Sequence, residues 1–185
     1  SFKKIIDNDK LNPYTRLKIN DSVIKSFKQR YNYLEKKNIN LEFDSEVILP
    51  LTSEQQLNHK IVNIFQKLDE LNIYAGGLNI NWFTDLNTFQ LKLYYKALED
   101  IWNYRAQLSN SQKCEIVPQN NMFIKSVPDL FIMNNKLGIQ NIILDEINKL
   151  VSSSSNKNNC ITGGYYVLTA LVEVSLDCSD CMPWL

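Results

Sequence analysis

The sequence has a single histidine, only three arginines and no excess of charge of either sign. Its 185 residues include 20 basic and 20 acidic side chains, which give a formal net charge of zero. Proteins that coat nucleic acid or an anionic membrane usually carry a basic excess, because neutralising phosphates supplies much of their affinity. The neutral total therefore argues against nucleic acid as a partner, although it is compatible with a local basic patch.

Long apolar runs are missing as well. No stretch of 18 consecutive apolar residues occurs, so the sequence predicts no membrane span. The first residues lack the apolar core of a secretory signal. The four cysteines are unevenly spaced, unlike those of a disulfide-stabilised domain, and this favours a reducing compartment.

The scarcity of histidine and glycine excludes several common mechanisms. A Ser–His or Cys–His mechanism would have to use His59, which we expect to be exposed on a helix. The pairs Gly76–Gly77 and Gly163–Gly164 lie in no phosphate-binding motif, and no G-x-S-x-G occurs. Glycines near a helix start can hold an anion, but we expect Gly163–Gly164 to permit close helix packing. The sequence therefore predicts no catalytic residue, no enzyme activity and no cofactor.

The chain is instead rich in asparagine, isoleucine and lysine, with 23, 19 and 17 residues. All three have A/T-rich codons, so this bias indicates an AT-rich genome more than a function. The hydrophobic fraction of 44% and the charged fraction of 22% are ordinary for a globular protein. One well-buried core is therefore expected.

Apolar residues recur at intervals of three and four over most of the chain, which is the period of an α-helix. The predicted helices span residues 21–37, 53–72, 87–108, 137–151 and 161–177, with a short helix between Ser109 and Pro118. The last long helix is apolar nearly all round, which is typical of a buried central helix. Its β-branched content leaves a buried strand as the alternative.

Other segments are predicted to lack helix. Residues 38–50 begin with alternating apolar and polar residues and are interpreted as an extended segment. Loops are expected over residues 79–86, 119–136 and 152–159, with Pro128 acting as a helix breaker. We therefore predict an all-α fold: an irregular bundle of about five helices with one extended N-terminal segment. Residues 1–20 are assigned to a polar N-terminal arm and residues 21–185 to a single helical domain.

Two cysteines near the C-terminus are the only candidate metal ligands with a recognisable spacing. Cys178 and Cys181 form a C-x-x-C pair, in which two thiolates can face one Zn²⁺. A closed zinc site needs four ligands, and no second paired motif supplies them. The alternative is that both are ordinary cysteines at a helix end.

The segment from Asp100 to Leu108 is the most distinctive in composition. It brings Trp102, Tyr104 and Arg105 together, and these residue types are enriched in the hot spots of protein interfaces. We expect Trp102 to lie in the core, and leave Tyr104 and Arg105 open between core and interface.

Several carboxylates lie on the predicted helices. Glu99–Asp100 and Asp145–Glu146 are adjacent pairs, whose side chains diverge by about 100° on a helix and so form no catalytic dyad. Glu173 is unusual because its surroundings are apolar. It is either a charge at the helix rim or the partner of a cation such as Arg105. A deep polar pocket around that pair would point to an enzyme.

Scattered blocks of the sequence resemble pieces of uncharacterised proteins of giant nucleocytoplasmic DNA viruses, of the mimivirus type. The blocks are Asn-Pro-Tyr-Thr-Arg at 12–16, Asp-Ile-Trp-Asn-Tyr-Arg-Ala-Gln-Leu at 100–108, Gly-Tyr-Tyr-Val-Leu at 164–168 and Pro-Trp-Leu at 183–185. The resemblance implies a viral protein located in host cytoplasm or in the virion. It implies no activity and no catalytic residue.

These observations favour a non-enzymatic protein-interaction or structural and assembly domain with a protein partner. The alternative is a zinc-stabilised module that uses Cys178 and Cys181 and associates with nucleic acid.

Overall fold

The computed structural model describes residues 5–6, 10–12, 15–37 and 51–185. Its contacts divide the chain into two units, Ser1–Pro50 and Leu51–Leu185, which are described separately. The predicted extended segment 38–50 lies outside the described residues. The helix predicted at 21–37 groups with the N-terminal unit and not with the later helices.

In the first unit, the described residues form one long helix, α2 (Asp21–Lys36), preceded by an isolated antiparallel bridge between Leu11 and Lys18. The side chain of Asn20 caps α2 by accepting a hydrogen bond from the backbone N–H of Ser22 at 3.0 Å. This short polar side chain satisfies one of the unpaired N–H groups at the helix start. Only Ile24 of the predicted apolar stripe is buried.

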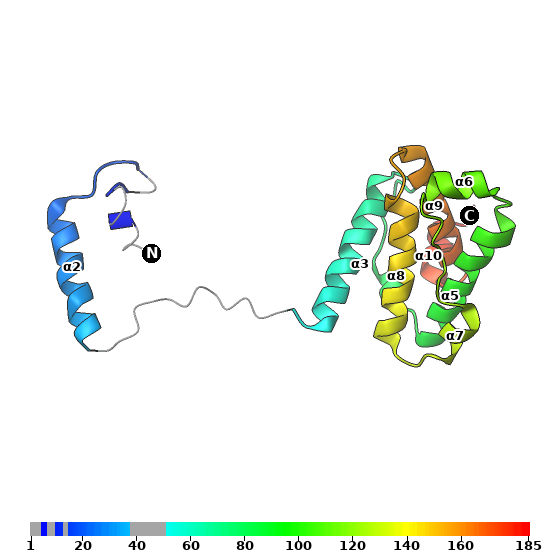
Figure 1. Ribbon diagram of the computed structural model, residues 1–185, viewed down its shortest axis with the longest axis horizontal. Helices are drawn as coiled ribbons and strands as arrows, with labels where there is room; N and C mark the ends of the chain where they lie inside the picture. Colours follow the sequence, from blue (N-terminus) through cyan, green and yellow to red (C-terminus); the bar gives the residue numbers. More distant parts are fainter. Residues whose placement is uncertain (1–4, 7–9, 13–14, 38–50) are drawn as a thin grey trace. The chain divides into compact units, whose positions relative to one another are not determined.

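The second unit contains most of the helical structure (Figure 1). Its helices are α3 (Ser53–Glu70), α4 (Asn81–Thr84), α5 (Thr88–Asp100), the π-helix η1 (Ile101–Arg105), α6 (Asn110–Ile116), α7 (Val127–Ile132), α8 (Lys136–Ser152), α9 (Lys157–Val172) and α10 (Leu176–Cys181). The described residues form no strand, so the all-α prediction is confirmed. None of their helices is long and apolar enough to cross a membrane.

The predicted number of about five helices is wrong, because nine α-helices are found among the described residues. The additional helices are short, and a segment of four to seven residues is too brief to show a helical period. Helix α4 lies in the predicted 79–86 loop and buries Trp82 and Phe83. Pro128 lies in the first turn of α7 and does not break a helix, because the first turn needs no donor there.

Helix ends also differ from the predicted positions. Helix α3 begins at the predicted residue, Ser53, with a capping box between Thr52 and Gln55, but it ends at Glu70, two residues before the predicted end. Asn72 there has a φ of 55°, so an asparagine supplies the left-handed turn. The predicted final helix is two helices, because Ser175 caps α10 after α9 has ended.

Helix α9 lies at the centre of the second unit and packs against α8, α5, α6 and α10. In Figure 1, α3 and α8 run side by side, and α9 and α5 follow across the bundle. A Cβ atom at Gly163 would lie 2.2 Å from the carbonyl oxygen of Leu150 in α8. The glycine thus allows close helix packing, as expected.

Candidate functional site

Helix α5 and η1 carry exposed aromatic side chains at the two ends of their outer face. Phe89 is 62% exposed and Tyr104 is 68% exposed. Leu93 and Asp100 are half-buried and Lys96 is exposed between them. Intervals of three and four residues align these side chains along one line of the helix. We call these five residues the α5 ridge.

The π-helix η1 sets the direction of the side chains at one end of the ridge. The N–H of Ala106 donates to the carbonyl of Ile101 at 2.9 Å, a bond that spans five residues. The turn therefore holds more residues than an α-helical turn, and such turns occur frequently at functional sites. In this turn Trp102 points into the core while Tyr104 points outward.

Trp102 is 3% exposed, so its predicted core position is confirmed. The Nζ atom of Lys113 lies 5.5 Å from the centroid of the Trp102 ring and donates to Asn103 at 3.1 Å. These contacts connect η1 to α6.

Arg105 donates a hydrogen bond to the carboxylate of Glu173 and forms an ion pair with it. This hydrogen bond raises the pKa of Arg105 above its ordinary value. The partner proposed for Glu173 from the sequence is therefore found. The side chains of Arg105 and Glu173 are 47% and 41% exposed, so the pair lies at the surface and not in the buried polar pocket expected of an enzyme.

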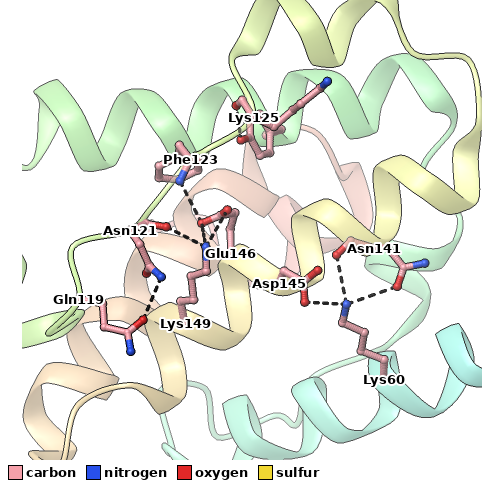
Figure 2. Close-up of polar contacts among 10 residues, drawn as sticks. Lys60, Gln119, Asn121, Phe123, Lys125, Asn141, Asp145, Glu146 and Lys149 are labelled. Atoms are coloured by element: carbon pink, nitrogen blue, oxygen red, sulfur yellow. Dashed lines mark hydrogen bonds and ion pairs between the residues drawn. The ribbon is translucent and has the colours of Figure 1, made fainter.

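A second polar cluster lies along α8 (Figure 2). The side chain of Glu146 is only 5% exposed and pairs with Lys149 at 3.1 Å. Glu146 also accepts a hydrogen bond from the N–H of Phe123 at 3.1 Å, and Lys149 donates to the carbonyl of Asn121 at 2.8 Å. The cluster holds the segment before α7 against α8. The sequence patterns did not predict this cluster, although the spacing of three between Glu146 and Lys149 is typical of an ion pair on one helix face.

The neighbouring carboxylate has a different partner. Asp145 pairs with Lys60 of α3 at 2.8 Å, and Lys60 also donates to the side chain of Asn141 at 3.3 Å (Figure 2). Asp145 and Glu146 thus bind separate lysines on separate elements. The prediction that this adjacent pair forms no dyad is confirmed.

A hollow of about 480 Å³ lies beside this cluster, within the size range of small-molecule sites. Its lining includes Ile124, Lys125, Ile142, Asp145, Glu146, Asn148 and Lys149. An ammonium has three N–H donors, and that of Lys149 donates to Asn121 and to both carboxylate oxygens of Glu146. The charges of this pair are thus engaged within the fold, which gives the cluster a structural role.

The two cysteines of the C-x-x-C pair differ in environment. Cys178 is fully buried, whereas Cys181 is exposed. Burial, with a smaller contribution from Cys181, raises the pKa of the Cys178 thiol to about 12. No group of three or more histidine, cysteine or acidic side chains that could hold a metal occurs in the part of the chain that the structure describes. The zinc site stays a prediction without structural support.

The predicted position of His59 is confirmed, because this side chain is exposed on α3. No family model, curated protein or solved structure matches the chain. The fold and the α5 ridge together define an all-α domain with exposed aromatic side chains on an otherwise well-packed helix.

Proposed function

We propose that residues 51–185 form a non-enzymatic protein-interaction domain whose partner binds the α5 ridge. The observation that carries this proposal is the exposure of Phe89 and Tyr104 on a helix whose opposite face is completely buried. Exposed aromatic side chains on a rigid element are typical of interface hot spots, because they bury a large area with little loss of side-chain freedom.

The ridge needs little rearrangement to bind. The hydroxyl of Tyr94 donates to the carbonyl of Val167 at 3.2 Å, and that of Tyr95 donates to the carbonyl of Lys125 at 2.6 Å. Gln90 donates to the carbonyl of Val174 at 3.1 Å. These bonds fix α5 against three other segments, so its outer face is preorganised and the entropic cost of binding is small.

The ridge also indicates the chemistry of its partner. Tyr104 lies 15 positions after Phe89, which corresponds to roughly 22 Å along a helix. Apolar contacts are available at both ends, while Lys96 and Asp100 offer one charge of each sign between them. A helical segment with apolar positions at its ends and charged positions in its middle matches this pattern.

The sequence resemblance supplies the biological setting of the proposal. A protein of a giant DNA virus that acts through an interaction surface belongs to the assembly or structural components made in host cytoplasm. The ridge is the surface through which such a component would join its neighbour.

Site-specific photo-cross-linking of the full chain tests the proposal. A photoreactive phenylalanine analogue at position 104 is expected to cross-link a partner in lysate of the producing cells, and one at the exposed Val62 of α3 is not. The pair Phe89→Ala and Tyr104→Ala should then abolish co-purification of that partner. The control pair Val62→Ala and Ile132→Ala also changes two exposed apolar side chains, and it should leave co-purification of the partner intact.

Equal cross-linking at positions 62 and 104 would exclude the ridge as the interface. So would co-purification that survives the Phe89 and Tyr104 substitutions. A chain that stays monomeric and captures nothing would contradict the proposed function itself.

A further inference from the structure

The net charge of the chain is zero, but its charged residues are unevenly distributed along the sequence. Residues 10–37 contain eight lysine or arginine residues and two acidic residues, Asp21 and Glu35, a formal net charge of +6. Residues 51–185 contain ten basic and thirteen acidic residues, a formal net charge of −3. The excess of positive charge is thus concentrated in the segment that ends with α2.

The positive charges of this segment are accessible. The basic residues Lys10, Arg16, Lys18, Lys25, Lys28, Arg30, Lys36 and Lys37 are all exposed. None of them forms an ion pair with an acidic side chain among the described residues. Their charges are therefore available to a partner, and electrostatic attraction between such a surface and an anion is strong at low ionic strength.

One face of α2 carries a regular polar line. Lys25, Gln29, Asn32 and Lys36 follow one another at intervals of four, three and four residues, which aligns them on one side of the helix. All four are exposed, and Asp21, four residues before Lys25, is the acidic residue at the start of this line. Lysines that reach phosphates, with amides between them that reach base edges, are a combination suited to nucleic acid.

The opposite face of α2 argues against a lipid surface. A helix that lies in a membrane interface inserts a continuous apolar face. Here Ile24 is buried, and Phe27, Tyr31 and Leu34 are half-buried. The rings of Phe27 and Tyr31 also contact each other, with their centroids 5.8 Å apart. The fully accessible face is the polar one.

An exposed tyrosine lies between two of the cations. The Nζ atom of Lys37 is 4.9 Å from the centroid of the Tyr33 ring, and the guanidinium of Arg30 is 5.6 Å from it. Tyr33 itself is 48% exposed. An aromatic ring beside cations can stack on a nucleic-acid base while the cations contact the neighbouring phosphates. An acidic polypeptide has no bases, so its binding would not use such a stacking surface.

We infer that residues 15–37 form a nucleic-acid-binding element, with the Lys25–Gln29–Asn32–Lys36 line of α2 as its contact face. The element is separate from the α5 ridge and lies in the other unit of the chain. It recognises the phosphate backbone through its lysines, and nearby bases through its amides and Tyr33.

Fluorescence anisotropy of the full chain with labelled duplex DNA and with labelled single-stranded RNA tests this inference. The triple substitution Lys25→Gln, Lys28→Gln and Lys36→Gln should weaken binding about tenfold or more at low salt. It should also reduce the slope of log K against log salt by about 2 to 3, the value for three lost phosphate contacts. The probe that binds more tightly, duplex DNA or single-stranded RNA, is the preferred form of nucleic acid.

The matched control removes the same charge elsewhere. Lys67→Gln, Lys125→Gln and Lys157→Gln affect three exposed lysines of the second unit outside the α5 ridge and should leave affinity and slope unchanged. Gln29→Ala with Asn32→Ala should weaken binding without changing the slope, because no charge is lost. Circular dichroism of each variant confirms that α2 is still folded.

Several results would overturn the inference. One is the absence of binding to either nucleic acid at low salt, and another is an equal loss in the two lysine triples. A third is equal competition by polyglutamate, which would show attraction to any polyanion. Binding to vesicles of phosphatidylserine and phosphatidylcholine, with no binding to nucleic acid, would instead identify a membrane surface.

Discussion

The carboxylate of Glu146 accepts a hydrogen bond from the backbone N–H of Phe123, and the two atoms are 3.1 Å apart. Phe123 has a φ of 55°, a conformation that residues other than glycine adopt rarely. The ring of Phe123 contacts that of Tyr95, with the centroids 5.4 Å apart. A buried carboxylate and a buried aromatic ring therefore stabilise this unfavourable backbone conformation together.

Removing the Glu146 carboxylate should destabilise the second unit. In Glu146→Ala, Lys149 loses its anion and the Phe123 N–H loses its acceptor, and we expect the free energy of unfolding to fall by about 3 kcal/mol. Glu146→Gln keeps an acceptor oxygen and should cost less, about 1 kcal/mol. Urea denaturation measures both. Asp145→Ala is the control, since the side chain of Asp145 is 62% exposed and its carboxylate should contribute under about 1 kcal/mol. Equal losses of unfolding free energy at positions 145 and 146 would refute the stabilising role of Glu146.

Helix packing at Gly163 gives a second prediction. In Gly163→Ala the new methyl group would meet the backbone of Leu150 at 2.2 Å, so the helices must separate. We expect a loss of about 1–3 kcal/mol in unfolding free energy and a lower Tm. Gly138→Ala in α8 meets its nearest atoms at an ordinary 3.4 Å and should raise stability by about 0.5–1 kcal/mol. Thermal unfolding of the two variants should move Tm in opposite directions.

The buried thiol of Cys178 predicts a loss of stability at alkaline pH. Its ordinary pKa is 9.0, and burial raises the pKa to about 12 in the folded chain. Below pH 9 the thiol is protonated in both states, so its stabilising contribution is complete. Above pH 9 the unfolded chain releases the proton first, and the contribution declines until the folded thiol also ionises near pH 12.

Cys178→Ala isolates this effect. The difference in unfolding free energy between the parent chain and the variant should shrink from pH 9 to pH 12, by at most about 1.4 kcal/mol per pH unit. Urea titrations at several pH values measure it. Parallel curves for the two proteins would contradict the prediction, and Cys181→Ala serves as the control because its thiol is exposed.

The Arg105–Glu173 pair should contribute little to stability despite its direct contact. Both side chains are more than 40% exposed, and exposed ion pairs contribute about 0.2–1 kcal/mol. A double-mutant cycle of Arg105→Ala and Glu173→Ala, followed by urea denaturation, should give a coupling energy in that range that decreases with added salt. A coupling several times larger would show that the pair is part of the core.

Much of the fold could be predicted because it depends on local patterns. The capping box of Thr52 and Gln55 and the cap at Asn87 are local hydrogen bonds, so they define helix starts directly from the sequence. The short helices α4 and α7 were not predicted, since tertiary burial of Trp82, Phe83 and Leu130 stabilises them more than any local period does.

The candidate sites divide in the same way. Spacing predicted the inward Trp102, and the unusual environment of Glu173 suggested its pairing with Arg105. The α5 ridge required knowledge of which face of α5 is buried, and the Glu146–Phe123 contact joins residues 23 positions apart. Neither has a local signature.

By itself, the sequence determined the all-α class, the long helices and the core position of Trp102. Helix formation and amphipathic burial follow from residues three or four positions apart, so these features can be derived from the sequence. Only the tertiary structure decided which side chains remain exposed, which lysine meets which carboxylate and at which residue the chain divides into two units. These features depend on contacts between distant segments, and each segment's free side chains are defined only after its neighbours have packed against it.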